Sequence, residues 1–168
     1  MELWDAYTRD GQRLGILLSR EEPIPAGMYH LVCEVLVRHT DGSFLCMKRH
    51  PNKKAYPGAL EATAGGSALA GETPPECIRR ELLEETGLSC DDFTEVAAPI
   101  RDCEQAIFRT YVCTVDCDKN AITLQEGETV GYVWLSEAEF IDFVNSDDII
   151  PTQKERFLPY YQQQGYLK

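Results

Sequence analysis

Residues 66–88, GSALAGETPPECIRRELLEETGL, constrain the fold of this chain more than any other stretch. Thr73 followed three positions later by Glu76 predicts a capping box at the start of a helix. Gly87 suits the position just after a helix, where the backbone is often left-handed. The sequence therefore predicts a helix over 74–86.

Three carboxylates share one face of this predicted helix. At 100° per residue, Glu81 and Glu85 lie about 40° apart, and Glu84 lies about 60° to the other side of Glu81. Like charges at these spacings destabilise a helix by a few tenths of a kcal/mol per pair. A hard cation such as Mg²⁺ offsets the repulsion because it takes oxygen ligands of this kind. The cluster therefore predicts a divalent-cation site.

Composition limits the classes of protein and partner. The chain has 168 residues, 43% hydrophobic and 26% charged, as expected for one soluble globular domain. The net charge of −12 argues against nucleic-acid polymers and anionic membranes as partners, because binding their phosphates needs an excess of Lys and Arg. There is no apolar run of the roughly 18–20 residues that a membrane span needs, and no secretory signal profile at the N-terminus. We therefore expect a cytoplasmic protein.

The cysteines also favour a cytoplasmic location. There are seven, an odd number, with no CxxC pair. Cys113 and Cys117 form the closest pair, but they have no partner pair and no His nearby, so we expect no zinc site. Unpaired thiols fit a reducing compartment.

Alternating apolar runs separated by turn signals predict the other elements. The strands are expected over 2–7, 13–18, 31–38, 43–49, 60–64, 93–99, 106–116 and 130–135, with further helices beginning at Ser136 and covering 152–163. Strands and helices interleave without a regular βαβ rhythm. This favours an α/β fold with a mixed sheet and helices on both faces, an α/β/α sandwich. We expect one domain, with an N-terminal hairpin over 1–27 and a core over 28–168.

Residues 66–88 also match the Nudix box at every defined position. The pattern of that box is Gly-x5-Glu-x7-Arg-Glu-(apolar)-x-Glu-Glu-x-Gly-(apolar). A chance match in a chain of 168 residues has odds on the order of 10⁻⁷, so a plain solvated acidic face is the weaker interpretation. The chain resembles the Nudix hydrolase superfamily. The resemblance implies an α/β/α sandwich and a Mg²⁺- or Mn²⁺-dependent enzyme that cleaves a small diphosphate linked to another group, X.

The resemblance assigns roles to residues by their position in the box. Metal binding falls to four groups, the carboxylates of Glu81, Glu84 and Glu85 and the carbonyl of Gly66. Glu72 has a supporting role, and Arg80 orients the carboxylates. The segment LQEGETVGYVWLS resembles the family's acidic loop, which makes Glu128, or else Glu126, a further carboxylate of the site.

The chemistry implied is attack of a metal-bound water on phosphorus. Glu81 or the loop carboxylate takes the proton from that water, and the choice between them stays open. Family likeness makes Arg49 and Lys48, at the end of a strand, the candidates for phosphate contact. Lys53 and Lys54 are weaker candidates.

The flanks of the box resemble the branch related to isopentenyl-diphosphate isomerase. The segments that carry this likeness are WDAYTRDGQRLG, PIPAGMYHLVCEVLV and FLCMKRHPNKKAYPGALEATAGGSALAGE. The isomerases use a Cys on the strand before the box and a metal-binding His just after it. Here Gly65 and Ser67 stand at those positions, so hydrolysis is the favoured chemistry. His30 is either a relic of the isomerase site or a core residue.

Two alternatives stay open, an isomerase of this branch and a non-catalytic Nudix module that binds a ligand. The identity of X is also open between a nucleoside and a prenyl-type group. Four aromatic residues either stack on a base or pack inside the protein: Tyr29, Tyr56, Phe108 and Tyr111. By analogy with the family, we expect a homodimer formed through the N-terminal hairpin.

Overall fold

A mixed β-sheet forms the centre of the protein, and a computed structural model describes all of residues 1–168. Strands β3 (His30–His39) and β9 (Ala106–Val115) run parallel, and every other pairing is antiparallel. The main path runs β10-β4-β3-β9-β7, and three short strands pair at its sides. The remaining bounds are β4 Phe44–Arg49, β5 Leu60–Glu61, β6 Thr63–Ser67, β7 Phe93–Ala97, β8 Ile100–Arg101 and β10 Thr129–Leu135.

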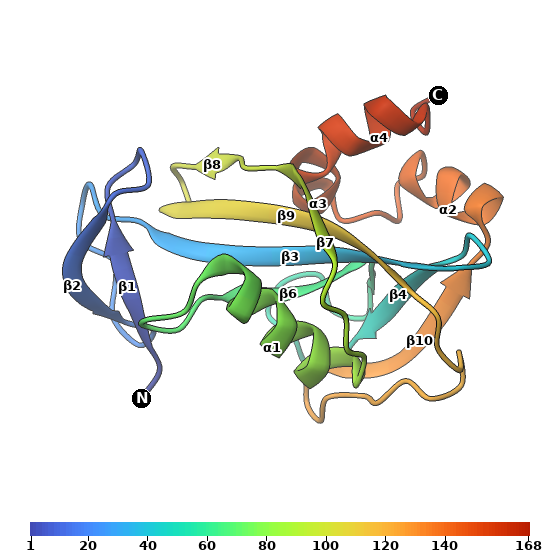
Figure 1. The fold of residues 1–168 in the computed structure, drawn as a ribbon, viewed down its shortest axis with the longest axis horizontal. Coiled ribbons are helices and arrows are strands. Elements are labelled where there is room, and N and C mark those ends of the chain that lie inside the picture. Colours follow the sequence, from blue (N-terminus) through green and yellow to red (C-terminus); the bar gives the residue numbers. More distant parts are fainter.

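Helices cover both faces of this sheet (Figure 1). Helix α1 (Pro74–Thr86) packs on one face through Cys77, Ile78 and Leu82, which are fully buried. The other face carries α2 (Glu137–Val144), α3 (Pro151–Arg156) and α4 (Leu158–Gln164). The two faces have separate hydrophobic clusters. The predicted α/β/α sandwich with a mixed sheet is therefore confirmed.

Strand β3 contributes side chains to both hydrophobic clusters. Its side chains alternate, as they must in a strand, so that Cys33 and Val35 face α1 while Leu36 faces the C-terminal helices. Glu34 lies on the second face and is buried. Arg156 of α3 neutralises it with two hydrogen bonds of 2.7 and 2.6 Å. Burial raises the pKa of Glu34, and the Arg156 charge lowers it.

The N-terminal segment forms a two-stranded antiparallel sheet beside the main body (Figure 1). Strands β1 (Leu3–Tyr7) and β2 (Arg13–Ser19) enclose a small cluster of Trp4, Ala6 and Leu18. Two backbone hydrogen bonds between Tyr7 and Tyr29 and one from Ala70 to Leu3 attach the hairpin to the body. The hairpin is thus held in a fixed place next to the loop that follows β6.

Helix α1 has the predicted bounds and caps. The Glu76 carboxylate accepts the backbone N–H of Thr73 at 2.8 Å, which is the capping-box contact. At the other end, Gly87 has φ of 74° and donates its N–H to the Leu83 carbonyl. Local sequence therefore sets both ends of the helix that carries the acidic cluster.

Three predicted elements differ from the structure. The strand expected over 60–64 is two strands, and Gly65 and Gly66 lie inside β6 and not in a turn. The strand expected over 93–99 stops at Ala97, because Pro99 has no N–H for a sheet ladder. The helix expected over 152–163 is α3 and α4, which meet at Phe157, because Pro159 cannot donate to the preceding turn.

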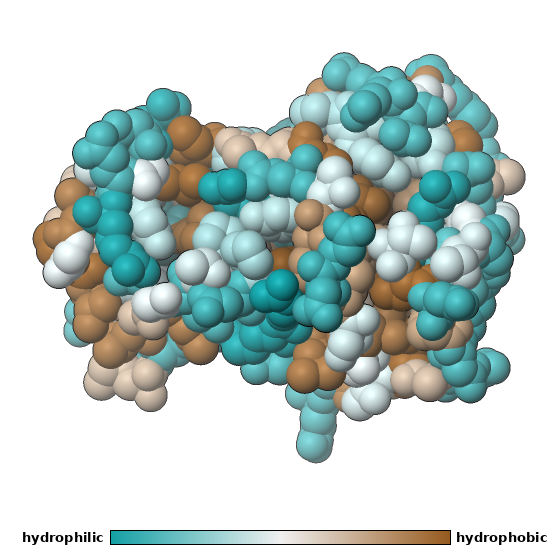
Figure 2. Space-filling view, in the orientation of Figure 1, coloured by the Kyte–Doolittle hydropathy of each residue, from teal (hydrophilic) through white to brown (hydrophobic).

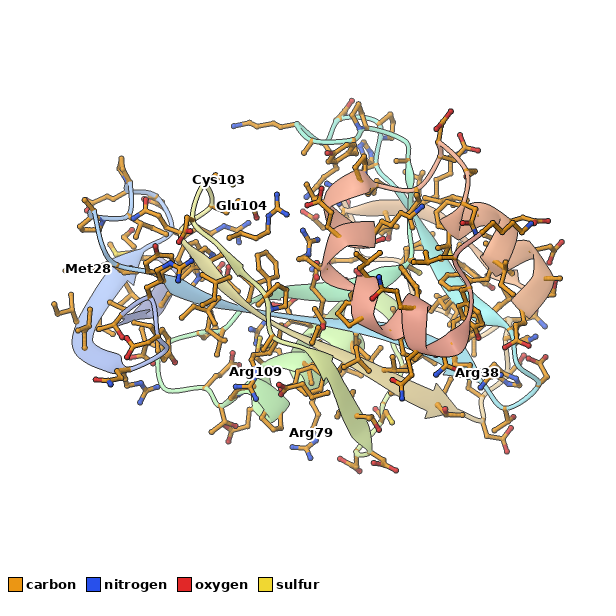
Figure 3. All side chains as sticks on the ribbon, turned by 90° about the horizontal axis from the view of Figure 1, so that it is seen from above. Met28, Arg38, Arg79, Cys103, Glu104 and Arg109 are labelled. Carbon is orange, nitrogen blue, oxygen red and sulfur yellow. The ribbon has the colours of Figure 1, made fainter.

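All seven cysteines are free thiols. Four of them are buried, namely Cys33, Cys46, Cys77 and Cys113. Cys103 is exposed at the turn between β8 and β9, where Figure 3 labels it beside Glu104. No helix of the chain combines the length and the apolar character needed to cross a bilayer.

Gly65 is the residue that lets β6 lie against β3. A Cβ at Gly65 would lie 2.2 Å from the Cys33 carbonyl oxygen and 2.7 Å from the Glu34 Cα, and neither backbone atom can swing away. We expect Gly65→Ala to lower the free energy of unfolding by about 3 kcal/mol through overpacking. Urea denaturation measures this loss.

Gly131→Ala is the matched control, because the nearest atom to its new Cβ is 3.9 Å away. We expect that variant to unfold at nearly the wild-type urea concentration. Equal stability of the two variants would contradict the role given to Gly65.

Candidate active site

A cavity of about 890 Å³ opens between the hairpin, β6, α1 and the loop before β10. Both negatively and positively charged side chains line it. Six carboxylates line it, from Glu2, Glu61, Glu81, Glu84, Glu85 and Glu128. Four cationic side chains face it as well, from Arg20, Arg49, Lys53 and Arg80. The acidic residues predicted on α1 thus line this cavity.

Arg80 links the acidic residues of the box. Its guanidinium donates to both oxygens of Glu72, at 2.7 and 2.9 Å. It also donates to Glu81 at 2.7 Å and to Glu84 at 3.2 Å. Hydrogen bonding to Glu72 raises the pKa of Arg80, and Glu81 raises it further. One guanidinium therefore fixes three of the four acidic residues of the box.

Glu81 lies directly against the backbone of β6. A Cβ at Gly66 would be 2.5 Å from one carboxylate oxygen of Glu81 and 2.7 Å from its carboxyl carbon. Burial raises the pKa of Glu81, while the contact with Arg80 lowers it. The second glycine of the pair therefore makes the space that this carboxylate fills.

Glu85 is the least compensated carboxylate of the cavity. Its one hydrogen-bond donor is the Gly65 backbone N–H, at 3.0 Å. Burial raises the pKa of Glu85 well above its ordinary value, and the nearby charge of Glu61 raises it further. A half-buried carboxylate without a cationic partner is costly, so this position favours a positively charged ligand.

The loop before β10 contributes Glu128 and not Glu126. Glu128 lines the cavity and forms an ion pair with Lys53, whereas Glu126 does not reach the lining. Lys53 thus faces the cavity, unlike Lys54.

The two predicted phosphate contacts have different outcomes. Arg49 lines the cavity, where it donates to Glu61 at 2.7 Å and to the Ala55 carbonyl. Lys48 does not line the cavity, so the structure does not support it as a phosphate contact. Neighbouring side chains of β4 point to opposite faces, and Met47 and Arg49 take the cavity side.

The structure also shows where the residues compared with the isomerase branch lie. Gly65 and Ser67 both line the cavity. His30 is a buried residue behind the cavity wall, stacked on Trp4 with ring centroids 4.5 Å apart and bound to the Gln105 carbonyl. Burial lowers the pKa of His30. The core interpretation of His30 is therefore the one that the structure supports.

None of the four aromatic residues considered for base stacking lines the cavity. Tyr29, Phe108 and Tyr111 are buried. Tyr56 is exposed and borders a separate hollow of about 320 Å³. Sequence reasoning missed Glu61 and Arg20, which no motif marks, because chain folding alone brings them to the cavity.

The donor set suits a hard divalent cation, since it consists of carboxylates and the Gly66 carbonyl. No three acidic, histidine or cysteine side chains meet as a ready-made ligand set, however. Arg80 holds Glu81 and Glu84 instead. A cation at this cluster would therefore compete with Arg80 for the carboxylates of Glu81 and Glu84.

Comparisons with known proteins agree with this geometry. The family description "NUDIX domain" matches residues 28–160. An uncharacterized Nudix hydrolase of Listeria monocytogenes is 29% identical over 151 residues, which cover 90% of this chain and 89% of that protein. An isopentenyl-diphosphate Delta-isomerase of Corynebacterium diphtheriae is 26% identical over 70% of this chain and 69% of that protein.

The fold has solved counterparts. A crystal structure from Deinococcus radiodurans superposes with a TM-score of 0.73 at 20% identity, covering 95% of this chain and 99% of the other. This chain belongs to the Nudix family. Its similarity to proteins named as Nudix hydrolases makes it a Nudix pyrophosphohydrolase.

Gly66→Ala tests the packing of Glu81 against β6. We expect the new Cβ to displace the Glu81 carboxylate and leave the strand intact, because only a side chain must move. The variant should keep its melting temperature within a few degrees. It should lose most of the rise in melting temperature that Mn²⁺ gives the wild type. An unchanged response to Mn²⁺ would contradict the placement of Glu81.

Proposed function

We propose that this protein hydrolyses a small diphosphate linked to a group X, with Mg²⁺ or Mn²⁺ as cofactor. The observation that carries the proposal is Glu85, a carboxylate with a raised pKa, one N–H donor and acidic neighbours. A divalent cation held by these carboxylates would neutralise the cluster and reduce its repulsion of substrate phosphates. An acidic cavity can then bind an anionic ligand.

Each cavity residue has a role in this proposal. Glu81, Glu84, Glu85 and the Gly66 carbonyl hold the cation. When bound, the cation supplies a water of lowered pKa and offsets charge on the diphosphate. Arg80, held by Glu72, orients the Glu81 carboxylate until the cation takes it up. Glu81 or Glu128 accepts the proton of the attacking water.

Two cationic side chains are the proposed phosphate contacts. Arg49 and Lys53 are paired in the cavity with Glu61 and Glu128. Phosphate oxygens can replace these carboxylates, because charge-assisted hydrogen bonds to phosphate have the same geometry. Lys53 therefore replaces Lys48 as the second proposed phosphate contact.

Hydrolysis is favoured over isomerisation by the residues at two positions. Gly65 and Ser67 supply neither the thiol nor the imidazole of the isomerase branch. A non-catalytic ligand-binding module is the second alternative, and the intact carboxylate set argues against it. Allylic product from isopentenyl diphosphate without phosphate release would support the isomerase. No phosphate release from a broad panel of diphosphates with Mg²⁺ would support the non-catalytic module.

Glu85→Gln should reduce the turnover of diphosphate hydrolysis by at least about a thousandfold, because it removes the central metal ligand. Phosphate release over nucleotide, sugar-nucleotide and prenyl diphosphates measures the effect. Glu76→Gln is the matched control on the same helix, since glutamine still serves in a capping box. Near-normal turnover in Glu85→Gln would refute the assignment.

The rest of the chain fits this function as one unit. We propose that residues 1–168 work as a single domain, because the hairpin over 1–27 and the core over 28–168 line the same cavity. The net charge of −12 supports a small substrate and not a nucleic-acid polymer or a membrane. The free thiols support a cytoplasmic location.

We also propose that the protein is a homodimer through the hairpin. Apolar side chains of β2 are exposed there, namely Leu14, Ile16 and Leu17, and Figure 2 shows hydrophobic surface gathered at that end. Leu17→Lys should convert the dimer to a monomer in sedimentation velocity. Leu124→Lys, at an exposed loop site, should leave it a dimer. A monomeric wild type would contradict this proposal.

A further inference from the structure

The hairpin contributes a wall of the cavity that the family match does not include. Residues 28–160 match the NUDIX domain, whereas Glu2, Leu3, Trp4 and Arg20 also line the cavity. The wall therefore has polar groups whose function the Nudix box does not explain.

Two donors of this wall converge on a single carboxylate. The Trp4 indole N–H donates to one oxygen of Glu2 at 2.9 Å. The Arg20 guanidinium donates to the other oxygen at 2.7 Å. Such a pair of donors suits any oxyanion, because the indole and the guanidinium have no acceptor atoms.

The indole is more deeply buried than the carboxylate that it binds. Trp4 is 8% exposed and is stacked on His30 at an interplanar angle of 16°. Glu2 lies next to the N-terminus, and its side chain is 32% exposed. An exposed ion pair contributes little to stability, so another anion can displace Glu2 at small cost.

Arg20 lines the same cavity as the proposed metal site. The charges of Glu128 and Glu81, both cavity residues, act on its guanidinium. Its direct ion-pair partner is Glu2. An anion bound to Arg20 and Trp4 would therefore share the cavity with a diphosphate held at Glu81 and Glu85.

We propose that Trp4 and Arg20 form an anion subsite for a phosphate or carboxylate of the substrate, and that the Glu2 carboxylate fills it when no substrate is bound. This rests on the proposed function, because the ligand is a part of that substrate. The subsite makes the hairpin a specificity determinant. It selects substrates that present an oxyanion at the hairpin end of the cavity.

The experiment uses inorganic phosphate, which is not hydrolysed, on the full chain with any tag at the C-terminus. The chain has two tryptophans, so its ¹H–¹⁵N spectrum has two indole signals, which Trp134→Phe assigns. Phosphate is titrated with and without Mg²⁺. In the wild type, the Trp4 indole signal should shift saturably as phosphate replaces Glu2.

Three variants give the expected pattern. Arg20→Gln should weaken phosphate binding at least about tenfold, since a charge-assisted hydrogen bond is lost. Glu2→Ala should tighten it up to about fivefold, because the internal competitor is removed. Arg13→Gln is the matched control, as Arg13 is on the same hairpin but pairs with Asp5 outside the cavity lining. It should bind phosphate like the wild type.

The proposed subsite is contradicted if phosphate does not shift the Trp4 indole signal. It is also contradicted if Arg20→Gln and Arg13→Gln bind phosphate equally well. Hydrolysis measured in parallel keeps the two proposals apart. Turnover of a diphosphate with Mg²⁺ but no shift of the indole signal would refute only the proposed subsite. A shift of the indole signal without turnover of any diphosphate would refute only the proposed activity.

A final comparison identifies which oxyanion the subsite takes. Matched diphosphates are assayed with and without an extra phosphate on X. A loss of kcat/KM in Arg20→Gln confined to the phosphorylated X assigns the subsite to X. An equal loss on both assigns it to the diphosphate, and no loss on either contradicts a role in substrate binding.

Discussion

The close contact between α1 and β6 is the constraint on which the site depends. Gly65 donates its backbone N–H to Glu85, and Gly66 leaves the space that the Glu81 carboxylate occupies. Side chains at either glycine would separate the strand from β3 or push the carboxylate from its place. The apolar stripe of α1 and its two caps then hold the helix at this distance. The arrangement of the acidic cluster is thus a consequence of backbone packing.

Charge balance inside the cavity is the second feature of the structure. Each of its four cationic side chains is paired with a carboxylate: Arg20 with Glu2, Arg49 with Glu61, Lys53 with Glu128, and Arg80 with the box glutamates. A cation that takes up the carboxylates leaves these donors free for phosphate. A phosphate that takes up the donors leaves carboxylates free for the cation. Metal and substrate should therefore bind with positive coupling.

Local signals explain what the sequence could predict. The helix, its caps and the shared face of Glu81, Glu84 and Glu85 follow from residues close together in the chain. Long-range contacts explain the rest. The Glu34–Arg156 pair joins residues 122 positions apart, and Arg20 and Glu61 reach the cavity only through the assembled fold. Lys48 does not line the cavity because side chains alternate along β4, and Met47 and Arg49 take the cavity side.

An anomalous-diffraction map of crystals grown with Mn²⁺ tests the central claim most directly. The account predicts a Mn²⁺ peak about 2.0–2.3 Å from carboxylate oxygens of Glu81 and Glu85, with Arg80 still paired with Glu72. Mn²⁺ bound elsewhere, or Glu81 still held by Arg80 with no metal at Glu85, would contradict it.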